Sequence, residues 1–331
     1  MRRFLPLALG AVFLLFVTAG TAHAFTIKVA SVAPESSPWG RALNRIAADW
    51  RDISGARVTL QIFHDGIAGE QNDIIRKMRI GQIGGALFTS DALALLSEEV
   101  FALSAPLLIR SDEELDYVFE RIRPEMDTSV EENNFEVVGW SKGGWVKFFA
   151  NEPIRSPEDL KDITLAVGDS QPETARAFRR MGYDVVPVRQ TALLSSLNSG
   201  MVDAFYASPI GAAGFQWFAR ADNMLDLQVA PFIGAFVVSD RVWSRVPEDL
   251  KPDLVESVNR QAEELDTAVE SLEAEAIETM QEHGLNVVTL SEAERERWFA
   301  EFEESLEVTV GTVFDEDTYR DIRGYLEEFR R

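Results

Sequence analysis

The chain has no cysteine and only three histidines among its 331 residues. The lack of cysteine excludes disulfide frameworks, thiol nucleophiles and thiolate zinc sites. Three imidazoles leave little material for a histidine-built metal centre, so we expect neither a metal ion nor any other cofactor. Basic side chains are scarce as well: 32 Lys and Arg face 55 Asp and Glu, for a formal net charge of -23. That charge repels phosphate backbones and argues against a nucleic-acid partner.

Long apolar runs are also missing, apart from one at the N-terminus. Arg2 and Arg3 precede the apolar stretch from Phe4 to Val17, which is shorter than the ~20 residues of a membrane-spanning helix. Ala22-His23-Ala24 supplies the small residues that precede a signal-peptidase cut. We predict a signal peptide over residues 1–24 and an exported, soluble, periplasmic protein. An uncleaved membrane anchor is the alternative.

Beyond residue 24, strand patterns alternate with helix patterns, which is typical of the α/β class. The segment Phe25 to Val32 reads as a strand, and Ser37-Pro38 provides a hydroxyl cap and a first-turn proline for a helix that reaches about Asp52. Two extended segments are unusually long, Phe135 to Ala150 and Asp226 to Ser239. Between them lies a small βαβαβ pattern. The sequence thus predicts two lobes joined by two crossing strands.

One long helix is predicted from Pro247 to His283, because its apolar residues step by three or four. We expect it to brace the two lobes as scaffold and to present an acidic outer face to solvent. The acidic residues of that face are Glu263, Glu264, Glu270, Glu273 and Glu275.

Polar and aromatic residues follow several of the predicted strands. Ligand sites of open α/β sheets lie beyond the carboxyl ends of the strands, so the residues after Val32, Phe88, Val167 and Ala207 should face one crevice. They are Ser36 to Trp39, Thr89-Ser90-Asp91, Gly168-Asp169-Ser170 and Ser208-Pro209. Acids such as Glu70, Asp91 and Asp169 lack the spacing of metal ligands.

Several stretches, in order, resemble the solute-binding proteins of tripartite ATP-independent periplasmic (TRAP) transporters of the C4-dicarboxylate-binding type. They are Thr26 to Trp50, Phe63 to Gly81, Ser97 to Leu108, Asn151 to Ile163, Met181 to Val188 and Leu197 to Asp203. The resemblance implies a two-lobed periplasmic-binding-protein-like fold with hinge-crossing strands and one long bracing helix. We assign residues 25–148 and 235–282 to lobe I, and residues 149–234 and 283–331 to lobe II. The resemblance also implies a small-molecule ligand, closure of the lobes over it and a membrane permease as partner.

The sequence departs from that family at one informative position. Most members carry an arginine that holds the ligand carboxylate where this chain has Ala166. Alanine offers neither charge nor hydrogen bond, so with the many aromatic residues it favours an apolar pocket. The pattern is similar to a TRAP subgroup with hydrophobic clefts and a periplasmic tetratricopeptide-repeat partner. We therefore expect a lipid-like or otherwise largely apolar ligand. A small organic anion held by Lys142, Lys147 or Arg189 is the alternative.

The predicted cleft combines aromatic walls with a few polar anchors, of which Ser90 and Ser208 are the first candidates. The expected ligand-binding residues are Trp39, Phe88, Thr89, Ser90, Trp140, Trp145, Lys147, Phe148, Ala166, Val167, Tyr206, Ser208, Pro209 and Phe236.

Two other classes of function remain open. A hydrolase would need a nucleophile and a base, but Gly-x-Ser-x-Gly is absent and His64 has no obvious serine partner. Paired carboxylates are possible among so many acids, yet no spacing singles out a pair. A protein-docking module that uses the acidic long helix is the other class. We expect no enzyme.

Overall fold

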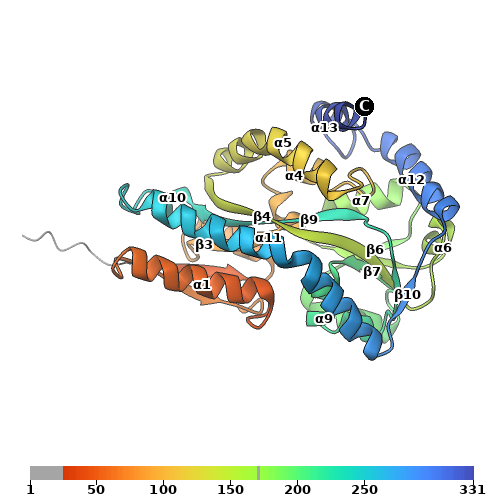
Figure 1. Cartoon of the computed structure of the whole chain (residues 1–331), viewed down its shortest axis with the longest axis horizontal. Helices are drawn as coiled ribbons and strands as arrows, with labels where there is room; N and C mark the ends of the chain where they lie inside the picture. Colours follow the sequence, from red (N-terminus) through yellow and green to blue (C-terminus); the bar gives the residue numbers. More distant parts are fainter. Residues whose placement is uncertain (1–24, 170–171) are drawn as a thin grey trace, which may run out of the picture.

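The computed structural model describes residues 25–169 and 172–331. The predicted signal peptide, residues 1–24, and Ser170 lie outside the described residues. Helices surround a long, continuous sheet in this part of the chain, and the molecule has two lobes, as predicted (Figure 1). None of the helices in these two ranges combines the length and the apolar character that a membrane span requires.

The first strand group is built around β1, which pairs in parallel with β2 and β3. On the other side of β3, the antiparallel strand β9 leads to β4. The strands of this group are β1 (Phe25–Ser31), β2 (Val58–Phe63), β3 (Gly85–Thr89), β9 (Ala230–Ser239) and β4 (Phe135–Ala150). The helices that follow these strands in the chain are α1 (Pro38–Ile53), α2 (Gln71–Arg79), α3 (Ser90–Leu93), α4 (Glu98–Leu103), α5 (Asp112–Glu132) and α10 (Asp240–Trp243).

The second strand group continues from the far end of β4. There β4 pairs with β7, β7 pairs in parallel with β5, and β5 with β6. This confirms the predicted βαβαβ unit, which consists of β5 (Leu165–Gly168), α7 (Pro172–Arg180), β6 (Val185–Val188), α8 (Leu193–Ser199) and β7 (Ala204–Ala207). Helix α6 (Pro157–Lys161) precedes the unit and helix α9 (Pro209–Gly214) follows it. Strand β8 (Asn223–Leu225) also pairs with β4 and with β10 (Asn286–Val288).

Local sequence explains where several helices begin. The Ser37 hydroxyl accepts a hydrogen bond from the Gly40 N–H, and Pro38 occupies the first position of α1, as predicted. At α6, Ser156 and Asp159 form a reciprocal capping box. Each cap satisfies backbone donors that the first helical turn leaves without partners.

The crossing strands differ from the prediction in one respect. Strand β4 spans both groups, whereas the strand predicted from Asp226 to Ser239 is shorter: β9 begins only at Ala230, and a break at residues 226–229 separates it from β8, which ends at Leu225. The break follows from local contacts: the Asp226 carboxylate binds Lys147, and the Val229 N–H bonds back to the Val146 carbonyl.

The predicted long helix is α11 (Lys251–Glu282), which crosses the face of the molecule from α10 to α9 and lies beside α1 (Figure 1). Two expectations about it were wrong. Glu273 does not lie on the solvated face, because its carboxylate accepts a hydrogen bond from the Trp145 N–H, 3.1 Å away. Nor is α11 scaffold alone, since four of its side chains line the central cavity, namely Val258, Gln261, Ala262 and Leu265.

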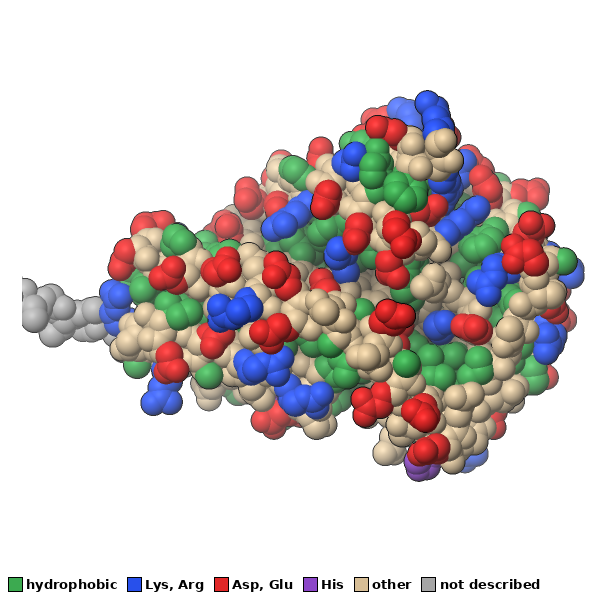
Figure 2. Space-filling model, in the orientation of Figure 1, with side chains coloured by type: hydrophobic (Ala, Val, Ile, Leu, Met, Phe, Trp, Pro, Cys, Tyr) green, Lys and Arg blue, Asp and Glu red, His purple; other side chains and the backbone are tan. Residues whose placement is uncertain are grey.

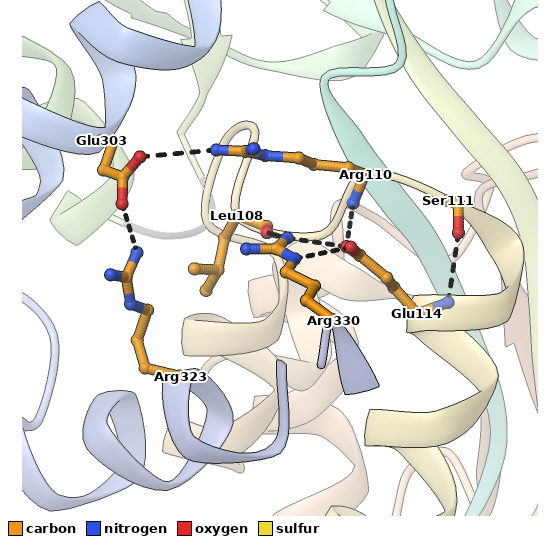
Figure 3. Close-up of polar contacts among 7 residues, drawn as sticks. All are labelled: Leu108, Arg110, Ser111, Glu114, Glu303, Arg323 and Arg330. Carbon is orange, nitrogen blue, oxygen red and sulfur yellow. Dashed lines mark hydrogen bonds and ion pairs between the residues drawn. The ribbon is translucent and has the colours of Figure 1, made fainter. Parts of the chain in front are cut away.

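The predicted C-terminal strand and two helices are β10, α12 (Glu292–Glu307) and α13 (Glu316–Phe329). Helix α13 packs against α4 and α5. The guanidinium of Arg330 donates to both carboxylate oxygens of buried Glu114, at 2.7 and 2.8 Å, and Glu303 pairs with Arg110 and Arg323 (Figure 3). These ion pairs fasten the end of the chain to the start of α5.

Candidate functional site

A cavity of about 270 Å³ lies at the carboxyl ends of strands from both groups. The residues after β1, β3, β5 and β7 all reach it, including Pro34, Ser90, Asp169 and Ser208. Strand β9 and helix α11 complete the walls. The structure therefore brings the four strand ends together in one site, which is where ligands of α/β sheets bind.

Most of the residues expected in the cleft line this cavity. They are Trp39, Phe88, Thr89, Ser90, Trp140, Ala166, Val167, Tyr206, Ser208 and Phe236. Four others are not among the lining residues, namely Trp145, Lys147, Phe148 and Pro209.

Those four side chains have other partners or places. The Lys147 ammonium lies 2.9 Å from the Asp226 carboxylate, and its side chain is 11% exposed. The Trp145 indole N–H donates to Asp112, at 2.9 Å. The Phe148 ring packs between the rings of Tyr206 and Trp298. Pro209 begins α9.

The hydroxyls proposed as polar anchors are engaged within the protein. Ser90 Oγ exchanges two hydrogen bonds with the backbone of Ile233, at 3.0 and 2.9 Å. Ser208 Oγ caps α9 by accepting from the Gly211 N–H. Thr89 bonds to the Gln71 side chain. These hydroxyls therefore hold the ends of the strands in place, and their hydrogen bonds to the protein compete with any bond to a ligand.

Basic side chains are missing from the walls. Among the described residues that line the cavity there is no lysine, arginine or histidine. Lys142 forms an ion pair with Asp116, and Arg189 is exposed. His64 is buried, with its Nε2 3.1 Å from Asn44 Oδ1 and outside the lining. Ala166, predicted to stand at the position of the family arginine, is 4% exposed and forms part of the wall.

Three carboxyl groups line the cavity instead: Glu70, Asp91 and Asp169. Burial, and then the charge of Asp169, raise the pKa of Asp91 to about 6. Burial and the charge of Glu70 raise the pKa of Asp169, although nearby Arg189 opposes that rise. Burial and the charge of Asp91 also raise the pKa of Tyr206. The position of Asp91 and Asp169 directly after two strands was the signal in the sequence for this cluster.

Within residues 25–169 and 172–331, no group of three or more His, Cys, Asp and Glu side chains has the geometry to hold a metal ion.

Contacts between the two strand groups cross the cavity. Glu70, just before α2, accepts a hydrogen bond from the Thr191 hydroxyl of the second strand group, at 2.5 Å. A Cβ atom on Gly168 would lie only 2.7 Å from Asp91 Oδ2, so the Asp91 carboxyl reaches across to the end of β5. Side chains of the two strand groups therefore meet at the cavity.

Residues 29–310 match the family model described as bacterial extracellular solute-binding protein, family 7 (DctP). The chain belongs to this family. Its members are solute-binding proteins, so the match fits the expectation that the chain is not an enzyme.

A curated relative of this family-7 chain is similar over part of its length. A solute-binding protein of Chromohalobacter salexigens is 23% identical over 55% of this chain and 55% of its own length. The chain thus spans about half the length of the first curated relatives that it matches.

Solved structures resemble the family-7 chain over nearly all of their length. A TRAP periplasmic solute-binding protein of Xanthobacter autotrophicus, with bound β-D-galacturonate, has a TM-score of 0.82 at 17% identity and covers 91% of this chain and 99% of its own. A sugar acid binding protein of Advenella mimigardefordensis, with galactonate, has a TM-score of 0.85 at 16% identity, with 92% and 99% covered. At such identities the likeness establishes the fold.

Proposed function

We propose that this chain is the extracytoplasmic solute-binding protein of a TRAP transporter. It captures a small molecule in the cavity between its lobes and delivers it to a membrane permease, working in the periplasm after removal of the leader. The observation that carries this proposal is the cavity at the carboxyl ends of both strand groups, in a chain of the family-7 fold. A tetratricopeptide-repeat partner remains a prediction that no contact in the structure supports.

The size of the cavity argues for a small ligand. About 270 Å³ lies just below the ~300–1,000 Å³ that is usual for small-molecule sites. A long hydrocarbon chain needs more room than that. The expectation of a lipid-like ligand does not fit this volume. We propose instead a small ligand with some apolar surface, which the aromatic walls can contact.

A small organic anion is the ligand class that the solved relatives favour, since two of them hold galacturonate and galactonate. In this chain such an anion would have to be bound without Lys147, whose ammonium pairs with Asp226 away from the lining. Gln190 and Thr174 are neutral polar residues of the lining that remain available for hydrogen bonds.

Native mass spectrometry tests the function directly. Protein purified from its own host, or incubated with a metabolite extract of that host, should retain one small molecule. Small-angle scattering should show a more compact particle once that molecule is bound, because the lobes close over it. A chain that retains nothing and does not change shape would be a docking module rather than a solute-binding protein.

A further inference from the structure

One polar side chain lies on the buried face of the long helix α11. Gln261 is 5% exposed and lines the cavity. It follows Leu254 and Val258 at helical spacing, at a position where an apolar side chain would continue the buried stripe. Burial of a carboxamide costs free energy unless its donors and its acceptor find partners. The place of Gln261 in the fold therefore calls for a partner at each end of its amide.

The protein supplies a partner for only one of those ends. The Arg45 guanidinium of α1 donates a hydrogen bond to Gln261 Oε1. Because a guanidinium can only donate, this bond fixes which end of the amide is the oxygen. The Nε2 amide group forms no hydrogen bond within the described residues. Its N–H donors are thus left over on a side chain that borders the cavity.

The other described lining residues of α1 and α11 are apolar. They are Trp39, Ala42, Leu43, Ile46, Val258, Ala262 and Leu265. Arg45 itself is exposed and lies outside the lining. In apolar surroundings a hydrogen bond is stronger than in water, and a donor without a partner costs more free energy. An acceptor that arrives with the ligand would remove this cost.

A second N–H donor of the lining also lacks an acceptor. Trp39, in the first turn of α1, lines the cavity, and no hydrogen bond within the described residues engages its indole N–H. Its Nε1 lies 3.5 Å from the point that a Cβ atom on Gly143 of β4 would occupy. Trp39 and Gln261 are neutral donors in a lining that, over the described residues, has no basic side chain.

We propose that Gln261 is a ligand-binding residue: its Nε2 amide donates a hydrogen bond to a carbonyl or carboxylate oxygen of the ligand, and Arg45 holds the amide in the orientation that this bond requires. The inference rests on the proposed function and deepens it by naming the chemical group that this wall recognises. It also gives α11 a part in binding that the periodicity of its sequence does not reveal.

Three probes of similar size test which group is recognised. Acetophenone and α-methylstyrene have nearly the same shape, but only acetophenone carries a carbonyl oxygen. Phenylacetate offers a carboxylate instead. Titration calorimetry measures the affinity for each probe. Loss of the donor should cost an oxygen-bearing probe about tenfold in affinity, because its oxygen is then buried without a partner.

Two variants of Gln261 remove the donor in different ways. Gln261→Met keeps the length of the side chain without polar atoms, whereas Gln261→Glu keeps an acceptor for Arg45 and has no N–H. Each should lower the affinity for acetophenone about tenfold and change that for α-methylstyrene by less than about twofold. The oxygen-bearing probe that loses more affinity in Gln261→Met identifies the preferred group. Gln281→Glu, at an exposed position of the same helix, adds the same charge and should leave each affinity unchanged.

A purely structural role of Gln261 makes different predictions. If the amide served only to tie α11 to Arg45, Gln261→Met would lower the melting temperature and weaken acetophenone and α-methylstyrene alike. We expect the melting temperature to stay within about 2 °C, because exposed Arg45 regains water when the bond is lost. Arg45→Met should lower the affinity for acetophenone about threefold, and Arg45→Lys, which keeps a donor for Oε1, should restore it.

Three results would overturn the proposal. They are an affinity for acetophenone and phenylacetate that survives in both Gln261 variants, an equal loss for α-methylstyrene, and no binding of either oxygen-bearing probe at millimolar concentration. The host molecule retained in the mass-spectrometric experiment separates this inference from the proposed function. If both Gln261 variants retain that molecule as well as the wild-type protein does, the inference fails and the function stands. If the wild-type protein retains nothing, the function itself fails.

Discussion

Ala166 is the residue that we predict to stand where most members of the family carry a carboxylate-binding arginine. It is buried in the cavity wall, within a site that holds Asp91 and Asp169. We expect Ala166→Arg to place a guanidinium in the cavity wall and to raise the affinity for galacturonate about tenfold or more. Titration calorimetry with galacturonate measures the change.

Ala166→Met is the matched control, because it adds bulk to the same wall without charge. It should not raise the affinity for galacturonate, because it only takes up space. If the two variants changed that affinity equally, the charge at this position would be irrelevant to selectivity.

The sequence could identify some residues of the site but not others, for physical reasons. Phe88 was within reach because it lies at the end of a predicted strand, and Trp39 because it lies in the first turn of the helix that follows one, where topology fixes the location. Lys147 was misplaced because its partner, Asp226, is distant in the chain and no local pattern links the two. Asp91 was visible as a residue, but the burial that raises the pKa of its carboxyl is a property of the folded cavity alone.

At the scale of elements, the bend of β4 is where the sheet passes from one strand group to the other. The register against β9 shifts between Lys142 and Trp145, and α11 places Asp266 and Glu273 on this bend. Gly144 has a φ of +88°, and a Cβ there would lie 2.3 Å from Glu273 Oε1. Only glycine fits this point without strain.

Gly144→Ala should therefore lower the free energy of unfolding by about 2–4 kcal/mol, from the left-handed backbone and the displaced carboxylate together. Urea denaturation measures the loss. Gly200→Ala is the control, because Gly200 has a φ of +71° but nothing within 4 Å of its built Cβ. It should cost only about 1–2 kcal/mol. Equal losses in both variants would mean that contact with α11 adds nothing at the bend.

The attachment of α13 to α5 depends on the pair Glu114 and Arg330. Because Glu114 is buried, removal of its charge leaves the Arg330 guanidinium without its bidentate partner. Glu114→Gln should cost about 2–4 kcal/mol of unfolding free energy and expose the C-terminal helix to proteolysis.

Arg320→Met on the same helix tests whether any lost ion pair has this effect. Arg320 pairs with Glu316 and Asp317 at the exposed surface, so its loss should cost less than about 1 kcal/mol. If both variants lost a similar amount of unfolding free energy, the buried pair would stabilise the protein no more than an exposed one.

For the molecule as a whole, periodicity predicted the two lobes and the long helix, but not what the helix does. The apolar side chains of α11 are well buried at Leu254, Val258 and Met280, and only partly buried between Ala262 and Ala276. Periodicity reports which side of a helix is apolar, not whether that side meets a core or a cavity. Acidic side chains are spread over the visible face of the molecule among basic and apolar ones, which fits the strongly negative sequence (Figure 2).

The pH dependence of stability should show the cost of the buried carboxyl groups. Burial raises the pKa of both Asp91 and Glu273 to about 6, above the ordinary values of 3.8 and 4.5. The folded state therefore binds more protons than the unfolded state between these values, so stability rises as the pH falls from about 7 toward about 5. Carboxyls with lowered pKa, such as Asp159 and Asp315, reverse the trend only at lower pH. The melting temperature of the ligand-free protein should thus pass through a maximum near about pH 5.

Two variants test this origin of the pH dependence. Asp91→Asn and Glu273→Gln should each raise the free energy of unfolding at about pH 8, by about 1–3 kcal/mol for Asp91, and flatten the profile. Asp52→Asn should leave the profile as it is. A wild-type profile that rises steadily from pH 5 to pH 8 would mean that these carboxyls carry no penalty in the folded state.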